Sequence, residues 1–221
     1  MNIGLQWWGR TEYFSALERM NMLQKQVATG HEPSVIVYTE HMPVITCGRS
    51  TPEKQVFNHL RIPVAKVPRG GLATWHGPGQ LVGYPVINLK ELYADRTPDL
   101  HSFLRHLEYG LIDFLSTQYS IQVMTRPGFT GVWILNEHTL PRKIASIGIS
   151  VKHFVTAHGF ALNVNCDMSG FHEIVPCGLT DIEMTSIQHE LALLQRPTET
   201  FDLKQISGDI HPFLVKELLR P

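Results

Sequence analysis

Residues 69–89 read RGGLATWHGPGQLVGYPVINL, a glycine-rich loop that continues directly into an apolar segment. Glycine allows the backbone to approach a ligand closely or to take a positive φ. Apolar residues in 81–89 occupy both faces of the expected strand, which indicates that the strand is buried on both sides. Glycines alone would also fit a simple turn between two strands. A turn does not need a guanidinium, an indole and an imidazole together, so Arg69, Trp75 and His76 favour a functional loop.

Outward from this stretch, strands and helices are predicted to interleave irregularly. Strands are expected at residues 1–8, 35–38, 44–47, 81–89, 121–124, 131–135, 144–151 and 154–164, with helices after Thr11 and Thr97 and at residues 185–194 and 200–219. Residues 49–61 are expected to form a loop with a short helical turn. Several strands follow one another closely enough for antiparallel pairing. The expected fold class is therefore α+β, a single domain over residues 1–221 with a mixed, mostly antiparallel sheet flanked by helices.

Local signals predict how the helices begin and which face they bury. The predicted helix starts are Thr11 as an N-cap, Pro98 as a first helical residue, and a capping box of Thr185 with Gln188. The apolar face of the first helix is expected to hold Phe14, Leu17, Met20, Leu23 and Val27. Gly208 and Pro212 are expected to interrupt the last helix.

Composition bounds the class of protein. The chain has 221 residues, of which 43% are hydrophobic and 18% charged, as in ordinary globular proteins. A formal net charge of −1 argues against broad binding of nucleic acid or membrane surfaces. A local basic face is still expected, because basic residues cluster at Arg49, Lys54, Arg61, Lys66 and Arg69.

The compartment is predicted from the cysteines and the N-terminal residues. Three cysteines are too few, and odd in number, for a disulfide framework, so a reducing compartment is expected. The first residues lack the pattern of a signal peptide, and no apolar run approaches a membrane span. A cytoplasmic location is expected, or a mitochondrial one if a presequence has been removed.

Two further stretches carry candidate chemistry. Residues 141–148, PRKIASIG, place Lys143 at the start of an apolar strand, and residues 174–180, IVPCGLT, place Cys177 in a turn. Cys47 and Cys166 lie in or beside strands and are expected to fill space. A thiol is only about 3% thiolate at pH 7. An ammonium about 4 Å away favours the thiolate by roughly 4 kcal/mol before desolvation is subtracted, so a Cys–Lys pair is a sensible activated nucleophile.

Other chemistries find weaker support in the sequence. His76 could serve as the base of a cysteine hydrolase, although no residue at a telling spacing identifies a partner that orients it. Cys166, His172 and Cys177 match no compact metal-binding spacing, so no metal is expected. No phosphate-binding loop is present.

Four motifs, in this order and spacing, resemble the octanoyltransferase family, also called lipoyl(octanoyl) transferase or lipoate–protein ligase B. They are RGGLATWHGPGQLVGYP, PRKIASIGI, HGFALNVN and FHEIVPCGLT. The resemblance covers most of the chain. It implies a fold related to the catalytic domains of biotin and lipoate protein ligases. It also implies transfer of octanoyl from octanoyl-acyl carrier protein to a lysine of lipoyl domains, those of 2-oxoacid dehydrogenase E2 subunits and of the glycine cleavage H protein.

The same resemblance implies roles for individual residues. Cys177 would carry the acyl group as a thioester, and Lys143 would lower the pKa of its thiol and shuttle protons. Substrate-binding residues would be Arg69, Gly70, Gly71, Leu72, Ala73, Thr74, Trp75, His76, Ser146, Ile147, Gly148, Gly159, Phe160 and Ala161. Cys47 departs from the family, where an apolar residue is usual.

The implied reaction needs no cofactor, because exchange between thioesters is nearly balanced and conversion of a thioester to an amide runs downhill. Three alternatives stay open at this point. They are an ATP-dependent lipoate or biotin ligase on the same fold, a non-catalytic protein that binds acyl groups or lipoyl domains, and a cysteine hydrolase.

Overall fold

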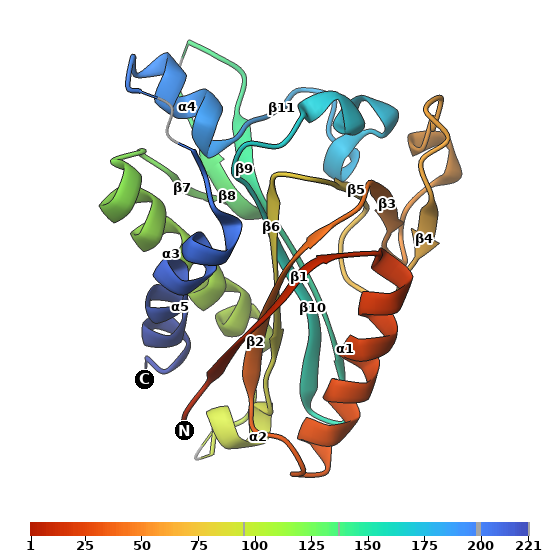
Figure 1. Cartoon of the computed structure of the whole chain (residues 1–221), viewed down its shortest axis with the longest axis vertical. Coiled ribbons are helices and arrows are strands. Elements are labelled where there is room, and N and C mark those ends of the chain that lie inside the picture. The colour runs from red at the N-terminus through yellow and green to blue at the C-terminus, as the bar shows by residue number, and fades with distance from the viewer. Residues whose placement is uncertain (95, 137, 198–199, 221) are drawn as a thin grey trace.

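A large mixed sheet runs through the protein, seen in the computed structural model in Figure 1. The structure describes residues 1–94, 96–136, 138–197 and 200–220, except for the side chain of Cys177. The strand order is β1 (Gly4–Thr11), β2 (Val35–His41), β6 (Gln80–Val86), β10 (Val155–Asn163), β9 (Arg142–Lys152), β8 (Phe129–Ile134) and β7 (Met124–Arg126), with β11 (Glu183–Met184) paired to β9. The β1–β2 and β11–β9 pairs are parallel and the other pairs are antiparallel. The predicted α+β class with a mostly antiparallel sheet is confirmed.

A small second sheet stands beside one end of the large one, at the upper right of Figure 1. Its order is β4 (Val64–Lys66), β3 (Val44–Cys47) and β5 (Ala73–His76). β5 was not among the predicted strands. It lies within the glycine-rich stretch, between Gly71 and Gly79, which both have positive φ. The stretch therefore joins the two sheets, since β5 belongs to one and β6 to the other.

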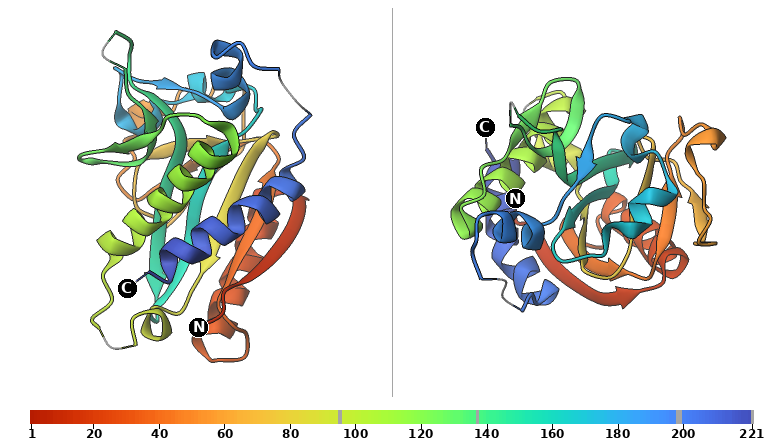
Figure 2. Two further views of the ribbon diagram at one scale, coloured as in Figure 1. Left: turned by 90° about the vertical axis from the view of Figure 1, so that its left-hand side faces the viewer. Right: turned by 90° about the horizontal axis from the view of Figure 1, so that it is seen from above.

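Helices cover both faces of the large sheet. α1 (Tyr13–Ala28) packs on β10 and β6, whereas α3 (Leu100–Tyr119) and α5 (Leu203–Leu218) pack against each other on the opposite face, as the left view of Figure 2 shows. Side chains along β2 alternate between the two faces of the sheet. Val35 and Val37 belong to the hydrophobic core beside α1, whereas Ile36 and Tyr38 belong to the core beside α3 and α5. The remaining helical elements are α2 (Leu89–Leu92), α4 (Ile187–Leu193), η1 (Glu53–Gln55), η2 (Met168–Glu173) and η3 (Pro176–Gly178). Among the helices described, none is long and apolar enough to cross a bilayer.

The predicted helix caps need correction. Glu12, not Thr11, caps α1, since its carboxylate accepts hydrogen bonds from the amides of Phe14 and Ser15. The Thr11 hydroxyl instead contacts Thr39 across the β1–β2 pair. Phe14 is 46% exposed and lies outside the buried face of the helix.

Two other helix starts also differ from the prediction, that of α3 by two residues and that of α4 by one. Asp99 caps α3, so Pro98 precedes the helix and is not its first residue. Ser186 caps α4, because the Thr185 hydroxyl is taken by the carboxylate of Glu190. The helix α5 runs through Pro212 without ending, since its buried face packs on α3 and the sheet and outweighs the local preference.

Burial of Cys47 and Cys166 follows the prediction, and the tryptophans differ in how deeply they are buried. Cys47 and Cys166 are each 7% exposed, so their predicted role as buried packing residues is confirmed. Trp133 is fully buried, while Trp7 and Trp8 are only partly buried at the edges of two hydrophobic clusters. Burial raises the pKa of the Cys166 thiol to about 12, which keeps this sulfur protonated.

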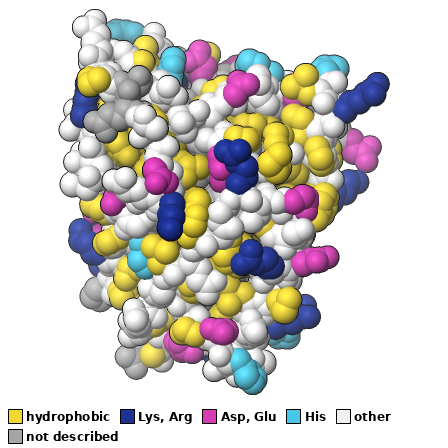
Figure 3. Space-filling view, in the orientation of Figure 1, with side chains coloured by type: hydrophobic (Ala, Val, Ile, Leu, Met, Phe, Trp, Pro, Cys, Tyr) yellow, Lys and Arg dark blue, Asp and Glu magenta, His cyan; other side chains and the backbone are white. Residues whose placement is uncertain are grey.

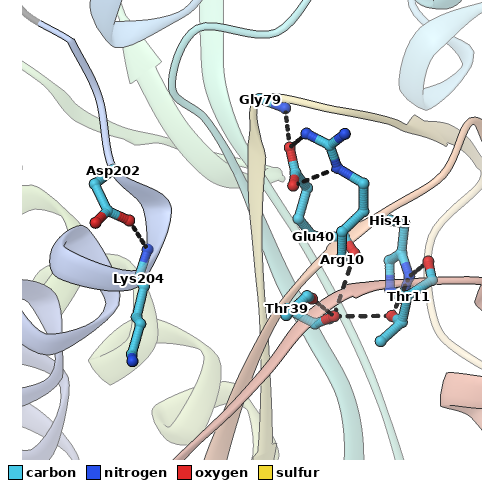
Figure 4. A network of polar contacts seen from close by, with 9 residues as sticks. Arg10, Thr11, Thr39, Glu40, His41, Gly79, Asp202 and Lys204 are labelled. Carbon is cyan, nitrogen blue, oxygen red and sulfur yellow. Dashed lines mark hydrogen bonds and ion pairs between the residues drawn. The ribbon is translucent and has the colours of Figure 1, made fainter.

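A polar network ties the edge of the large sheet to the turn after β5 (Figure 4). Glu40 on β2 accepts hydrogen bonds from the guanidinium of Arg10 at 2.7 and 3.1 Å and from the amide of Gly79 at 2.7 Å. Gly79 must lack a side chain, since a Cβ would lie 2.7 Å from the backbone of Cys166. Glu40 thereby holds the turn that connects the two sheets.

We expect Glu40→Ala to lower the free energy of unfolding by about 2 kcal/mol, because hydrogen bonds to a charged group contribute roughly 1.5–3 kcal/mol each. Urea denaturation followed by circular dichroism measures the change. Glu53→Ala is the matched control, because Glu53 pairs with Lys66 at 3.9 Å on the exposed surface and should contribute little. Equal effects of the two substitutions would contradict the assigned role of Glu40.

Candidate active site

A cavity lies where β5 meets strands β6, β9 and β10 of the large sheet. Its lining combines three stretches that are far apart in sequence: 69–76, 143–148 and 158–161. The residues that line it are Tyr13, Arg69, Gly71, Leu72, Ala73, Thr74, His76, Val82, Tyr84, Lys143, Ser146, Ile147, Gly148, His158, Gly159, Phe160 and Ala161. The structure thus brings together all the predicted substrate-binding residues except Gly70 and Trp75.

Trp75 and Gly70 lie beside the cavity but not in its wall. Alternation along β5 turns the Trp75 indole away, where it packs edge-on against Phe171 with the ring centroids 5.3 Å apart. A Cβ on Gly170 would lie 2.2 Å from that indole, so this glycine leaves the space that the ring fills. The Gly70 amide donates a 3.0 Å hydrogen bond to the Ile149 carbonyl on β9.

The first residues of the glycine-rich stretch are fastened by Arg69. Its Nη2 donates to both the carbonyl and the hydroxyl of Thr46 at 2.8 Å, and its Nη1 donates to the Gly70 carbonyl at 3.0 Å. A Cβ on Gly148 would lie 2.8 Å from the Gly70 carbonyl oxygen, so the loop rests directly on the β9 backbone. Only a glycine permits this approach.

Lys143 enters the cavity wall from β9 as a buried cation. Its side chain is held by the Thr130 carbonyl, to which Nζ donates at 2.9 Å, and lies over the Trp133 ring at 4.7 Å from the centroid. A Cβ on Gly131 would lie 2.5 Å from Cε of Lys143, so Gly131 makes the channel for the lysine stem. The buried carboxylate of Glu108 on α3 accepts the Gly131 amide at 2.7 Å and holds that strand in place.

The turn that contains Cys177 lies against the cavity. The Val175 amide donates to the Gln55 carbonyl at 2.9 Å, and the Gly178 amide donates to the Val175 carbonyl at 3.0 Å. Gly178 has a φ of 70°, and a Cβ there would lie 2.4 Å from Cδ1 of Leu72 in the cavity wall. The backbone of Cys177 belongs to this turn, while its side chain lies outside the described part of the structure, so its meeting with Lys143 stays a prediction.

Three buried imidazoles lie at or next to the cavity wall: His76 and His158 line it, and His41 contacts the lining residue Tyr84. His76 contacts Gln80 Oε1 at 2.7 Å through Nδ1 and Thr46 Oγ1 at 3.3 Å through Nε2. The Nε2 atom of His41 lies 2.6 Å from the Tyr84 hydroxyl. Chiefly through loss of solvation, burial lowers the pKa of His76 to about 3 and the pKa values of His41 and His158 to about 4. All three rings are therefore neutral at pH 7, and the side chains of Gln80 and Thr46 hold the His76 ring in place.

Tyr13, Tyr84 and His158 are cavity residues that sequence reasoning missed. Tyr13 lies at the start of α1 and Tyr84 within β6, where both fit an ordinary hydrophobic pattern. His158 has a φ of 58° in the middle of β10, a left-handed conformation that no sequence pattern announces. Its place directly before Gly159 in the HGFALNVN motif was the available signal.

Within the described ranges, no group of three or more His, Cys, Asp or Glu side chains is arranged so that it could hold a metal ion. Cys166 and His172, whose spacing did not favour a metal site, lie in different environments, since Cys166 is buried and His172 is exposed.

The sequence matches the family of lipoyl protein ligase A/B catalytic domains over residues 12–207. An octanoyltransferase of Cutibacterium acnes is 38% identical over 209 residues, covering 94% of this chain and 74% of the relative. An octanoyltransferase of Geobacter metallireducens is 40% identical over 211 residues, covering 96% and 92%. The chain belongs to this family. Its relatives place it among the acyltransferases.

Solved structures of lipoate and biotin protein ligases have a similar fold. A putative lipoate protein ligase of Thermoplasma acidophilum with bound lipoic acid aligns with a TM-score of 0.63 at 12% identity, covering 98% of this chain and 84% of that one. A biotin protein ligase of Aquifex aeolicus in complex with biotin and ATP aligns with a TM-score of 0.55 at 12% identity, covering 97% and 70%. At these identities the likeness concerns the fold alone, and it confirms the expected relation to biotin and lipoate ligase domains.

The buried imidazoles predict a pH-dependent stability. Their pKa values in the folded protein lie below the ordinary 6.5, so between pH 6.5 and about 4 the unfolded chain binds protons that the folded chain does not. Their contribution is fully present above pH 6.5 and is lost as the pH falls toward 4, by up to about 1.4 kcal/mol per pH unit for each ring.

Urea unfolding at pH 7, 6 and 5 tests this expectation. His158→Asn removes one imidazole and keeps a residue that tolerates a left-handed backbone. We expect the free energy of unfolding of the variant to fall less steeply with decreasing pH than that of the unmodified protein. Parallel curves for the two proteins would contradict the assignment of His158 as a buried neutral ring.

Proposed function

We propose that this protein transfers an octanoyl group from octanoyl-acyl carrier protein to a specific lysine of lipoyl domains, through a thioester on Cys177. We also propose that residues 1–221 act as one catalytic domain. The observation that carries the proposal is the cavity that gathers the 69–76, 146–148 and 159–161 segments around the buried Lys143. The acceptors proposed are the lipoyl domains of 2-oxoacid dehydrogenase E2 subunits and the glycine cleavage H protein.

The proposed reaction has two half-reactions. In the first, the Cys177 thiolate attacks the thioester carbonyl, and the carrier's sulfur leaves and takes a proton from the Lys143 ammonium. In the second, the amine of the acceptor lysine attacks the Cys177 thioester, an amide forms, and Cys177 leaves as a thiolate. The proton lost by the attacking amine returns to Lys143, so the enzyme ends in its starting state. No hydrolysis of a nucleotide enters this balance.

The cavity offers the acyl chain an apolar wall and a polar inner end. Leu72, Val82, Phe160 and Ala161 provide apolar surface along its length. Burying seven methylene or methyl groups at about 0.8 kcal/mol each contributes roughly 5–6 kcal/mol. Tyr84 also lines the cavity and contacts His41 at 2.6 Å, so a chain long enough to reach the Tyr84 hydroxyl would displace a polar contact.

We expect one octanoyl adduct on Cys177 when the protein is mixed with octanoyl-acyl carrier protein and examined by intact-mass spectrometry. The adduct should be absent in Cys177→Ala and should disappear when a lipoyl domain is added. Lys143→Ala should slow acylation by about 100-fold or more, because a proton-transfer group contributes about 10²–10⁴ in rate. Lys152→Ala, an exposed lysine at the other end of β9, is the matched control.

Three outcomes would contradict the proposed octanoyl transfer through Cys177, each in a different way. An adduct that survives Cys177→Ala would place the nucleophile elsewhere. A strict requirement for ATP would favour a ligase on the same fold. Release of free octanoate at a rate indifferent to the lipoyl domain would favour a cysteine hydrolase.

A basic face beside the Cys177 turn supports recognition of an acidic carrier. We define this basic face by the exposed cations Arg49, Lys54, Arg61 and Lys66. Backbone hydrogen bonds join this segment to the Cys177 turn: the Phe57 amide donates to the Glu173 carbonyl, and the Val175 amide donates to the Gln55 carbonyl. Phe57, Leu60 and Val64 are exposed in the same segment, and Figure 3 shows basic, acidic and hydrophobic side chains at the right-hand rim of the molecule, the side where Figure 1 places β4.

We expect the rate constant kcat/KM for octanoyl-acyl carrier protein to fall about tenfold between 50 mM and 500 mM salt, since exposed charges mainly steer encounter. Charge reversal by Lys54→Glu with Lys66→Glu should remove most of this dependence, while Lys25→Glu on α1 should not. Octanoyl-N-acetylcysteamine, which has no carrier, is the control substrate. A salt effect of equal size on both substrates would contradict a role of the basic face in docking.

A further inference from the structure

A second groove reaches Lys143 from the opposite side of the loop at residues 70–72. Its outer wall is apolar and comes from three separate elements: Leu104 on α3, Phe129 on β8 and Leu179 after the Cys177 turn. Ile149 on β9 completes this apolar lining. The groove shares five lining residues with the cavity described above: Gly71, Leu72, Lys143, Ile147 and Gly148.

The geometry of β9 separates the groove from the cavity. Along this strand Ser146 lines only the cavity, whereas Ile149 lines only the groove and packs toward the core beside α3. Gly70 closes the space between them, since its amide bonds to the Ile149 carbonyl at 3.0 Å. The cavity and the groove adjoin at the residues that they share, so a group in the groove and a chain in the cavity would meet at Lys143.

The lining of the groove restricts what it can bind. Among its described lining residues, the polar side chains are the Thr130 hydroxyl and the Lys143 ammonium, and no carboxylate is present. An apolar lining disfavours a charged ammonium and favours the neutral amine, which is the nucleophilic form. The four methylenes of a lysine stem suit apolar walls.

We propose that this groove receives the side chain of the acceptor lysine, while the acyl chain occupies the cavity. This rests on the proposed transfer of octanoyl through Cys177. A pantetheine arm fits the groove less well, because it carries two amides whose donors and acceptors need partners when buried. In the groove the amine nitrogen forms its bond to the thioester carbon, the bond to the Cys177 sulfur breaks, and the amine proton passes to Lys143.

A pair of isosteric variants tests the proposal. Leu104→Glu places a carboxylate in the groove, and Leu104→Gln places a neutral group of the same size. The octanoyl-enzyme is formed first and isolated, and its discharge by an apo lipoyl domain is then followed by intact-mass spectrometry between pH 6 and 10. Because the carboxylate stabilises the ammonium of the incoming lysine, we expect discharge of Leu104→Glu at pH 7 to be about tenfold slower than that of Leu104→Gln, which corresponds to a rise of about one unit in its apparent pKa. The two rates should converge at high pH.

Controls distinguish this role from a structural one. Leu100→Glu and Leu100→Gln lie one turn earlier on α3, outside the groove, and should discharge at equal rates. A merely structural role of Leu104 would slow both Leu104 variants equally at every pH and would overturn the proposal. A loss confined to acylation by octanoyl-acyl carrier protein would assign the groove to the donor arm and would also overturn it. Absence of any acyl-enzyme in the unmodified protein would instead refute the proposed function.

Discussion

The close contact of residues 69–71 with the backbone of β9 is the constraint on which the site depends. It requires Gly148 on the strand, where a Cβ would lie 2.8 Å from the Gly70 carbonyl oxygen. It also requires Gly48, where a Cβ would lie 2.1 Å from the Gly71 carbonyl oxygen. Arg69 fixes the loop in this position through Thr46, on the small sheet. The contact joins the two sheets and forms the partition between the cavity and the second groove.

Burial of the Lys143 side chain is the second constraint, and the surrounding elements offset its desolvation. The Thr130 carbonyl accepts from the ammonium, and the Trp133 ring lies beneath it. Gly131 leaves room for the stem, while Glu108 holds the Gly131 amide from α3. A lysine held in this way loses little further freedom when a substrate arrives, so its position is largely prepared before the reaction.

The sequence predicted the large sheet well, because its strands follow simple hydrophobic patterns that burial enforces. It predicted helix starts less well, since Thr11 and Thr185 compete with neighbours that only tertiary contacts reveal, such as Thr39 and Glu190. For the candidate site, motifs identified most of the cavity lining. They could not show that Trp75 faces away, because its orientation depends on β5, which the glycine-rich stretch concealed. His158 opens the HGFALNVN motif, but the motif did not reveal that this residue lines the cavity with a left-handed backbone.

The fold itself does not determine the chemistry, since related folds include ligases whose structures hold ATP or biotin. In this chain the placement of the polar groups is informative. The buried imidazoles His41, His76 and His158 are neutral, so they shape the cavity without adding charge near the acyl chain. Positive charge in the described lining comes from Arg69 and Lys143, and Arg69 is engaged by Thr46 and Gly70. Lys143 is therefore the cation placed where cavity and groove meet, and in the proposed reaction it is the group positioned to exchange protons with both substrates.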